Sequence, residues 1–145
     1  MIEESLVASL LEALNRAEIM ALSTLDRDGG SWTSPVQYQW DRHLNLYFAS
    51  LPGARHVANL RRDARVSTAI YSFPGPPGGN LGLQIRGTAT PAGAADGQGW
   101  LRFKITPTEA WCFDSRADRQ RHRIDLPGLD LGADEPRGFP RGLGA

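Results

Sequence analysis

The sequence of 145 residues is poor in cysteine, since Cys112 is its single example. One thiol excludes an internal disulfide framework and any metal site built from clustered cysteines. Long apolar runs are also missing, and none approaches the roughly 20 residues that a membrane-spanning helix needs. We therefore expect no membrane partner and no disulfide-stapled scaffold.

An excess of charge of either sign is missing as well. Lys+Arg and Asp+Glu both number 16, which gives a formal net charge of +0. Because general affinity for nucleic acid needs surplus positive charge, no nucleic-acid partner is expected. The first residues, MIEESLVASLLEALNRAE, are acidic where a secretory signal is basic, so we expect a cytoplasmic location. Hydrophobic residues make up 41% of the chain, a value typical of one globular domain.

Two segments have the spacing of amphipathic helices. Residues 5–16, SLVASLLEALNR, place their leucines on one stripe, with Ser5 as the predicted N-cap. The second segment, GARHVANLRRD at 53–63, follows a Pro-Gly turn and has arginines on its outer face. Both helices are expected to cover the ends or faces of a sheet.

Short apolar segments predict a mainly β protein. A hairpin turn, DRDGG at 26–30, joins the first two of these segments, and we expect the first three to form an antiparallel meander. The Pro- and Gly-rich residues 73–80 predict an exposed loop, and residues 91–103 a connection leading into a short helix. The sequence thus predicts a six-stranded antiparallel barrel with helical caps. The predicted strands are 18–25, 31–40, 44–50, 65–72, 81–90 and 108–115.

The composition changes near the end of the chain. Residues 1–115 carry the periodic apolar pattern of a folded domain, whereas residues 116–145 are rich in charge, glycine and proline. We expect this C-terminal tail either to be part of the same domain or to be mobile. No internal repeat and no second domain is indicated.

The turn before the second predicted helix brings together groups that suit a phosphate. A helix N-terminus offers free N–H groups, Arg55 a forked cation, and His56 and Ser50 further donors. An ordinary strand–turn–helix connection with a surface arginine explains the same residues, so both interpretations stay open on this evidence. The three histidines are too scattered along the chain to suggest a metal site.

A family resemblance rests on an ordered set of short motifs. The segment ALSTLDRDGGSWTSPVQYQWDRHLNLYFASLPGARHVANLRRDARVSTAIY, followed by LQIRGTAT, resembles the pyridoxamine phosphate oxidase-like family of FMN-binding split β-barrels. FKITPTEAWCFDS, at 103–115, is similar to the late strand of that family. The resemblance covers residues 1–115, and its weight lies in the order of the motifs.

The resemblance implies a homodimer that binds FMN at the subunit interface and transfers a hydride between a reduced donor and a small-molecule substrate. It implies no particular catalytic acid or base. In the family pattern, the strand end and basic turn hold the flavin phosphate, the SPVQ strand meets the ring edge, and two later residues complete the pocket from the second subunit. The matching positions are Ser50, Arg55 and His56 for the phosphate, Ser34, Pro35, Val36 and Gln37 for the ring, and Gln84 and Trp111 for the second subunit.

The chain departs from the family pattern at the basic turn. The family commonly has Ser-Arg-Lys or Ser-x-Lys where this sequence has Ala54, Arg55 and His56. A histidine, with an ordinary pKa of about 6.5, carries only part of a charge at neutral pH. This departure leaves deazaflavin or haem as alternative cofactors. It also leaves open a carrier, a sensor or a cofactor-free dimeric scaffold. The C-terminal segment specific for vitamin B6 is not found, so oxidation of that vitamin is not predicted.

Overall fold

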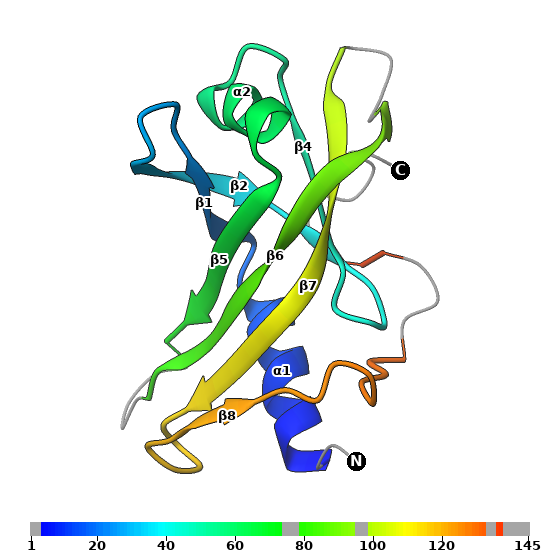
Figure 1. The fold of residues 1–145 in the computed structure, drawn as a ribbon. Helices are drawn as coiled ribbons and strands as arrows, with labels where there is room; N and C mark the ends of the chain where they lie inside the picture. Colours follow the sequence, from blue (N-terminus) through cyan, green and yellow to red (C-terminus); the bar gives the residue numbers. More distant parts are fainter. Residues whose placement is uncertain (1–3, 74–78, 95–98, 133–135, 138–145) are drawn as a thin grey trace.

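A computed structural model describes residues 4–73, 79–94, 99–132 and 136–137. Two helices, α1 (Glu4–Arg16) and α2 (Arg55–Arg62), accompany eight strands (Figure 1). None of the helices in these ranges is long and apolar enough to cross a membrane. The strands are β1 (Ile19–Leu25), β2 (Ser31–Gln37), β3 (Gln39–Trp40), β4 (Leu46–Ser50), β5 (Arg65–Ser72), β6 (Leu81–Ala94), β7 (Leu101–Asp114) and β8 (Arg121–Arg123).

The strands form one antiparallel sheet in the order β2-β1-β5-β6-β7-β4-β3, with β8 paired to β7. The long strands β6 and β7 make up its centre and curve across the whole molecule in Figure 1. The predicted mainly β, antiparallel split barrel is confirmed, but with eight strands in place of six. The prediction missed β3 and β8 because strands of two and three residues are too short to show a periodic pattern.

The predicted meander of the first three strands is wrong. The strand expected over 31–40 is two strands that separate at Tyr38. The buried Tyr38 hydroxyl shares its single proton between the carbonyl oxygens of Leu14 and Ala17, at 2.7 and 2.8 Å, which ties this point to the end of α1. Consequently β2 pairs with β1, whereas β3 pairs with β4 at the opposite edge of the sheet, and β4 pairs next with β7.

The connection predicted over 91–103 is also different. Strand β6 runs on to Ala94 and β7 begins at Leu101, so the described part of this region is extended and contains no helix. Register shifts after Arg86 and after Pro91 bend the β6–β7 pair. Residues 95–98, and 74–78 of the predicted exposed loop, lie outside the described residues.

The core lies between the concave side of the sheet and α1. Helix α1 buries Leu10, Ala13 and Leu14 against β5, β6 and β7. Beyond residue 115, β8 extends the sheet, and Ile124, Leu129 and Leu131 are buried in the same core. The described part of the C-terminal segment therefore packs on the barrel of its own chain.

Candidate binding cleft between β2 and β4

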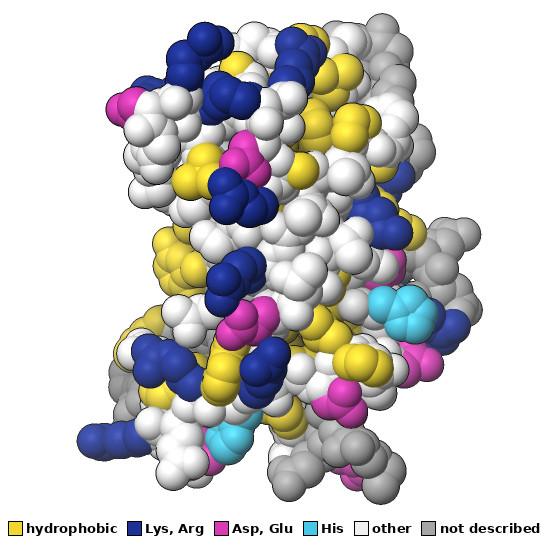
Figure 2. All heavy atoms as spheres, in the orientation of Figure 1, with side chains coloured by type: hydrophobic (Ala, Val, Ile, Leu, Met, Phe, Trp, Pro, Cys, Tyr) yellow, Lys and Arg dark blue, Asp and Glu magenta, His cyan; other side chains and the backbone are white. Residues whose placement is uncertain are grey.

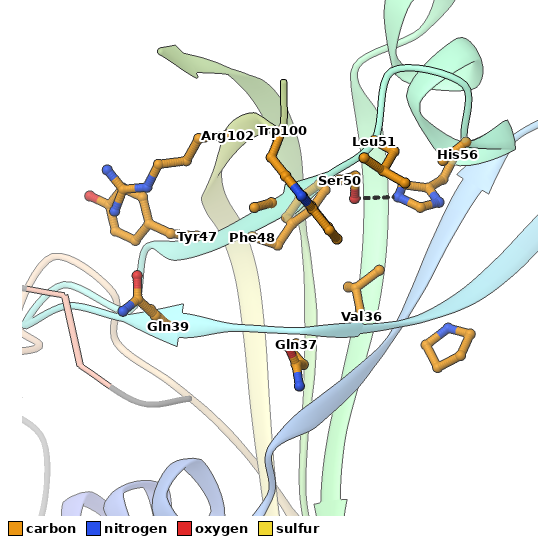
Figure 3. A pocket seen from close by; sticks show the side chains of 13 residues that line it. Val36, Gln37, Gln39, Tyr47, Phe48, Ser50, Leu51, His56, Trp100 and Arg102 are labelled. Atoms are coloured by element: carbon orange, nitrogen blue, oxygen red, sulfur yellow. Dashed lines mark hydrogen bonds between the residues drawn. The ribbon is translucent and has the colours of Figure 1, made fainter. Parts of the chain in front are cut away.

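The barrel wall is open between β2 and β4. Strand β3 pairs with β4 at Gln39–Tyr47 and Trp40–Leu46, but no ladder in the described residues joins β2 to β4 beyond that point. A cavity of about 330 Å³ occupies the opening, within the usual range for small-ligand sites. Figure 3 shows β2 and β4 passing on either side of it.

The two strands bordering the cleft have free backbone edges. β2 is paired on one side only, with β1, and residues 48–50 of β4 are paired only with β7. Backbone N–H and C=O groups on such edges need partners from outside the sheet. The cleft therefore offers hydrogen-bonding groups in fixed positions along two walls.

One end of the cleft is formed where β4 passes into α2. A hydrogen bond from the Ala54 N–H to the Leu51 carbonyl, 3.0 Å long, closes the turn between these elements. Across it, Ser50 Oγ lies 2.6 Å from His56 Nε2, and the dashed line in Figure 3 marks this contact. Ser50 is 4% exposed and His56 9% exposed. Burial lowers the pKa of His56 below its ordinary 6.5, so the imidazole is neutral at pH 7.

The N-terminus of α2 adds free donors at this end. Its N-cap, Ala54, has no side chain that could accept a hydrogen bond from the first turn. The N–H groups at the start of a helix then need an acceptor from solvent or from a ligand, and the helix dipole favours a negative one. Ser50, Ala54 and His56 all line this corner of the cleft, so a hydroxyl, an imidazole and the start of α2 lie together there.

Arg55 lies outside the cleft, although it is adjacent to His56 in the sequence. Its guanidinium donates to both carboxylate oxygens of Asp26, at 3.1 and 2.5 Å, and lies 3.8 Å from the centre of the Trp32 ring. Successive helical residues point about 100° apart, so the side chains at 55 and 56 leave the first turn of α2 in different directions. The structure places His56 in the cleft and Arg55 against the β1–β2 hairpin.

The other end of the cleft holds Arg102, which the sequence analysis did not single out. Arg102 lies opposite Ala49 in the β4–β7 pairing, and its guanidinium is 4.6 Å from the centre of the Tyr47 ring. Burial, followed by the neighbouring Asp41 carboxylate, raises the pKa of Tyr47 to about 12, so this hydroxyl stays protonated. Only the register of β7 could have placed Arg102 here, and the strand predicted from the sequence, 108–115, begins seven residues after Leu101, the first residue of β7.

Between these ends the walls are apolar and aromatic. Val36 points from β2 toward Phe48 and Trp100 on the other side of the cleft, whereas the Gln37 side chain points to the opposite side of β2 (Figure 3). Phe48 is itself stacked on Phe103 in the core, with ring centres 5.2 Å apart. The cleft is therefore a flat apolar slot with polar groups at both ends.

The remaining predicted residues lie elsewhere. Gln84 and Trp111 line a second cavity, of about 360 Å³, on the outer face of β1, β5, β6 and β7. The Trp111 indole N–H donates to Glu109 at 2.7 Å, and Glu109 also pairs with Arg86 at 2.7 Å. Figure 2 looks onto this face, where uncharged polar surface separates scattered charges of both signs. Of the nine predicted residues, Ser34 and Arg55 line neither cavity, whereas Pro35, Val36, Gln37, Ser50 and His56 line the cleft.

An antiparallel split barrel with a ligand-sized cleft at the split defines the class of this protein. Its family follows from the sequence: the chain belongs to the pyridoxamine 5'-phosphate oxidase family, whose model matches residues 6–126. No curated protein matches the chain.

Several solved structures share the fold. A heme binding protein from Mycobacterium smegmatis superposes with a TM-score of 0.69 at 16% identity, covering 88% of this chain and 60% of its own. General Stress Protein 26 from Bacillus anthracis superposes with a TM-score of 0.62 at 12% identity, covering 82% of this chain and 98% of its own. The heme storage protein HutZ from Vibrio cholerae superposes with a TM-score of 0.59 at 15% identity, covering 70% of this chain and 89% of its own. At such identities the likeness establishes the fold alone.

Proposed function

We propose that the cleft between β2 and β4 binds FMN and that the protein is an FMN-dependent oxidoreductase acting on a small molecule. One observation carries the proposal: a flat apolar slot ends in a buried corner of hydroxyl, imidazole and helix N-terminal donors. A flavin nucleotide has the matching parts, a planar heteroaromatic ring and a terminal phosphate.

The middle of the cleft fits the ring. Val36, Phe48 and Trp100 supply apolar and aromatic surface for a planar group. The free backbone edges of β2 and β4 supply donors and acceptors for the polar ring edge. This combination of apolar walls with a few fixed polar groups is typical of cofactor sites.

The corner at α2 fits the phosphate. The Ser50 hydroxyl and the first N–H groups of α2 donate to anionic oxygens without requiring a cation. His56 orients Ser50 through their 2.6 Å contact: with the proton of the neutral imidazole on Nε2, His56 donates to Ser50 Oγ, and the single Ser50 proton stays available for the phosphate. The predicted third member, Arg55, reaches this corner only after leaving Asp26, so our proposal relies on Ser50, His56 and the helix end.

When bound, FMN supplies hydride and electron transfer, and the protein supplies binding and orientation. The free backbone edges of β2 and β4 hold the ring edge in a fixed direction, while Phe48 and Trp100 exclude water from the slot. We assign no catalytic acid or base to this chain.

We extend the proposal to a homodimer in which the outer face of the sheet contacts a second copy. The predicted cofactor residues Gln84 and Trp111 lie on that face and cannot reach the cleft of their own chain. Two large hydrophobic side chains at the end of β5, Tyr71 and Phe73, are 66% and 65% exposed there. A partner would cover this surface and bring its Gln84 and Trp111 to the cleft.

A second candidate is a haem-binding carrier. A neutral, buried imidazole such as that of His56 is the form of histidine that coordinates iron. Two proteins of the same fold are named for haem binding or storage. The spectra of the two cofactors differ enough to separate the candidates in one experiment.

The test is a titration of the purified protein, stripped of any bound chromophore, with FMN and with haem in parallel. We expect quenching of flavin fluorescence at one site per chain, and bleaching of the bound flavin by NADH or NADPH without oxygen. Bound flavin that neither nicotinamide reduces would support a carrier. A haem spectrum with no flavin quenching would refute the proposal and favour the haem candidate.

A further inference from the structure

The cleft carries one permanent charge that no described lining residue neutralises. Among the described residues that line it, Arg102 is the only permanently charged one, and none is a carboxylate. Within the described ranges, the Arg102 guanidinium packs over the Tyr47 ring. A partly buried cation without a counter-ion is costly unless a ligand supplies the opposite charge.

The platform beneath Arg102 is rigid. The Tyr47 hydroxyl donates to Asp41 at 2.9 Å, and the same carboxylate accepts from the His43 and Asn45 backbone N–H groups, each at 3.0 Å. The Asn45 side chain donates a further bond to it at 2.9 Å. A guanidinium lying on a fixed ring keeps the donors at its edge free, in the planar arrangement that matches a carboxylate.

Arg102 and the Ser50–His56 corner lie at opposite ends of the cleft. Figure 3 shows Phe48 and Trp100 between them, with Arg102 beside Tyr47 on the far side. A cofactor whose phosphate occupies the Ser50 corner would leave the Arg102 end open to a second molecule. The geometry provides two anion-binding ends separated by an aromatic slot.

We propose that Arg102 recognises the carboxylate of the substrate and that the substrates are small planar carboxylates. This inference rests on the proposed function in one respect, since the flavin is taken to occupy the Ser50 end. It adds the substrate class, which neither the fold nor the family fixes. Arg102 selects for charge by a paired hydrogen bond, and the apolar slot selects for flatness.

The test compares benzoate with benzamide, which share a shape and differ in charge, by calorimetric titration into FMN-loaded protein. We expect benzoate to bind about tenfold more tightly than benzamide. Arg102→Gln should abolish this preference, and Arg102→Lys should retain part of it, because an ammonium keeps the charge without the fork. Arg119→Gln, which removes an exposed arginine outside the cleft lining, should leave the preference intact.

Equal affinities for the two probes in the wild-type protein would overturn the proposal, as would a preference that survives Arg102→Gln. A loss of FMN affinity but not riboflavin affinity in Arg102→Gln would also overturn it, by assigning Arg102 to the cofactor phosphate. If the wild-type protein takes up no FMN, the proposed function fails on its own. The same two probes titrated into the purified protein still decide the role of Arg102.

Discussion

Asp26 holds Arg55 through both of its carboxylate oxygens, which fixes the start of α2 against the β1–β2 hairpin. Asn59, one turn later in the helix, donates to the same carboxylate at 2.9 Å. The interaction with Arg55 lowers the pKa of Asp26, so the pair stays charged at neutral pH. Arg55, the basic residue of the turn, is thus bound by a carboxylate of its own chain.

This pair leads to the first prediction. Arg55→Ala should change FMN affinity by less than about threefold, because Asp26 and Trp32 hold the guanidinium away from the cleft. The melting temperature should fall only slightly, since Arg55 is 54% exposed and solvent-exposed ion pairs contribute little. Fluorescence titration and thermal denaturation measure the two effects. A tenfold loss of FMN affinity with unchanged riboflavin affinity would show instead that Arg55 grips the phosphate.

The sequence predicted the regular part of the fold because its strands bury alternate residues. Leu81, Leu83 and Ile85 alternate along the predicted strand 81–90, and all three are buried in the core. It could not predict how β2 and β3 separate, because this depends on the Tyr38 hydroxyl reaching the end of α1, more than twenty residues away in the chain. Contacts between distant segments leave no local pattern.

The candidate site, like the fold, could be predicted from the sequence only in part. Ser50 and His56 could be brought together from the sequence because a short turn joins the elements that carry them. Arg102 could not be found, because its position depends on the pairing of β7 with β4. The family resemblance assigned Gln84 and Trp111 to the pocket of a second subunit, and both lie on the outer face of the sheet, away from the cleft of their own chain.

The second prediction concerns stability and pH. Burial lowers the pKa of His56 in the folded protein, so the unfolded chain binds the extra proton more readily. Stability should therefore decrease as the pH falls through the ordinary histidine pKa of about 6.5. His56→Gln, which keeps a polar side chain without titrating, should flatten this part of the profile. Denaturant unfolding at several pH values tests it, and an unchanged profile in the variant would contradict the burial argument.

A third prediction concerns the contact between the end of β7 and α1. Asp114 accepts a 2.9 Å hydrogen bond from Ser9 and forms an ion pair with Arg116. The interaction with Arg116 is the main reason that the pKa of Asp114 is lowered to about 2. The folded state thus keeps this stabilisation above the ordinary carboxyl pKa and loses it as the pH falls toward 2. Asp114→Asn should cost about 1–2 kcal/mol of unfolding free energy at neutral pH. This loss of unfolding free energy should become smaller as the pH falls toward 2. A loss that is equal at all pH values would contradict its assignment to the charge of Asp114.

The fourth prediction tests the dimer. Ala69 lies on β5 in the lining of the outer cavity, and Ala69→Glu would place a charge within the proposed interface. We expect light scattering to give the mass of a single chain for this variant and of two chains for the wild type. FMN affinity should fall when the dimer is lost, since Gln84 and Trp111 of the second copy no longer reach the cleft. Ala8→Glu, on an exposed position of α1, is the matched control. Dimers that persist in Ala69→Glu would show that another surface pairs the chains.

The most direct test of the central claim compares FMN with riboflavin, which lacks only the phosphate, in binding to the wild-type protein and to Ser50→Ala. We predict that the wild type binds FMN at least about tenfold more tightly and that Ser50→Ala loses most of this difference, because the phosphate loses a charged hydrogen bond. Ser31→Ala, at an exposed hairpin position, should behave as the wild type. Equal affinities of the wild-type protein for FMN and riboflavin would contradict the phosphate corner at Ser50 and His56.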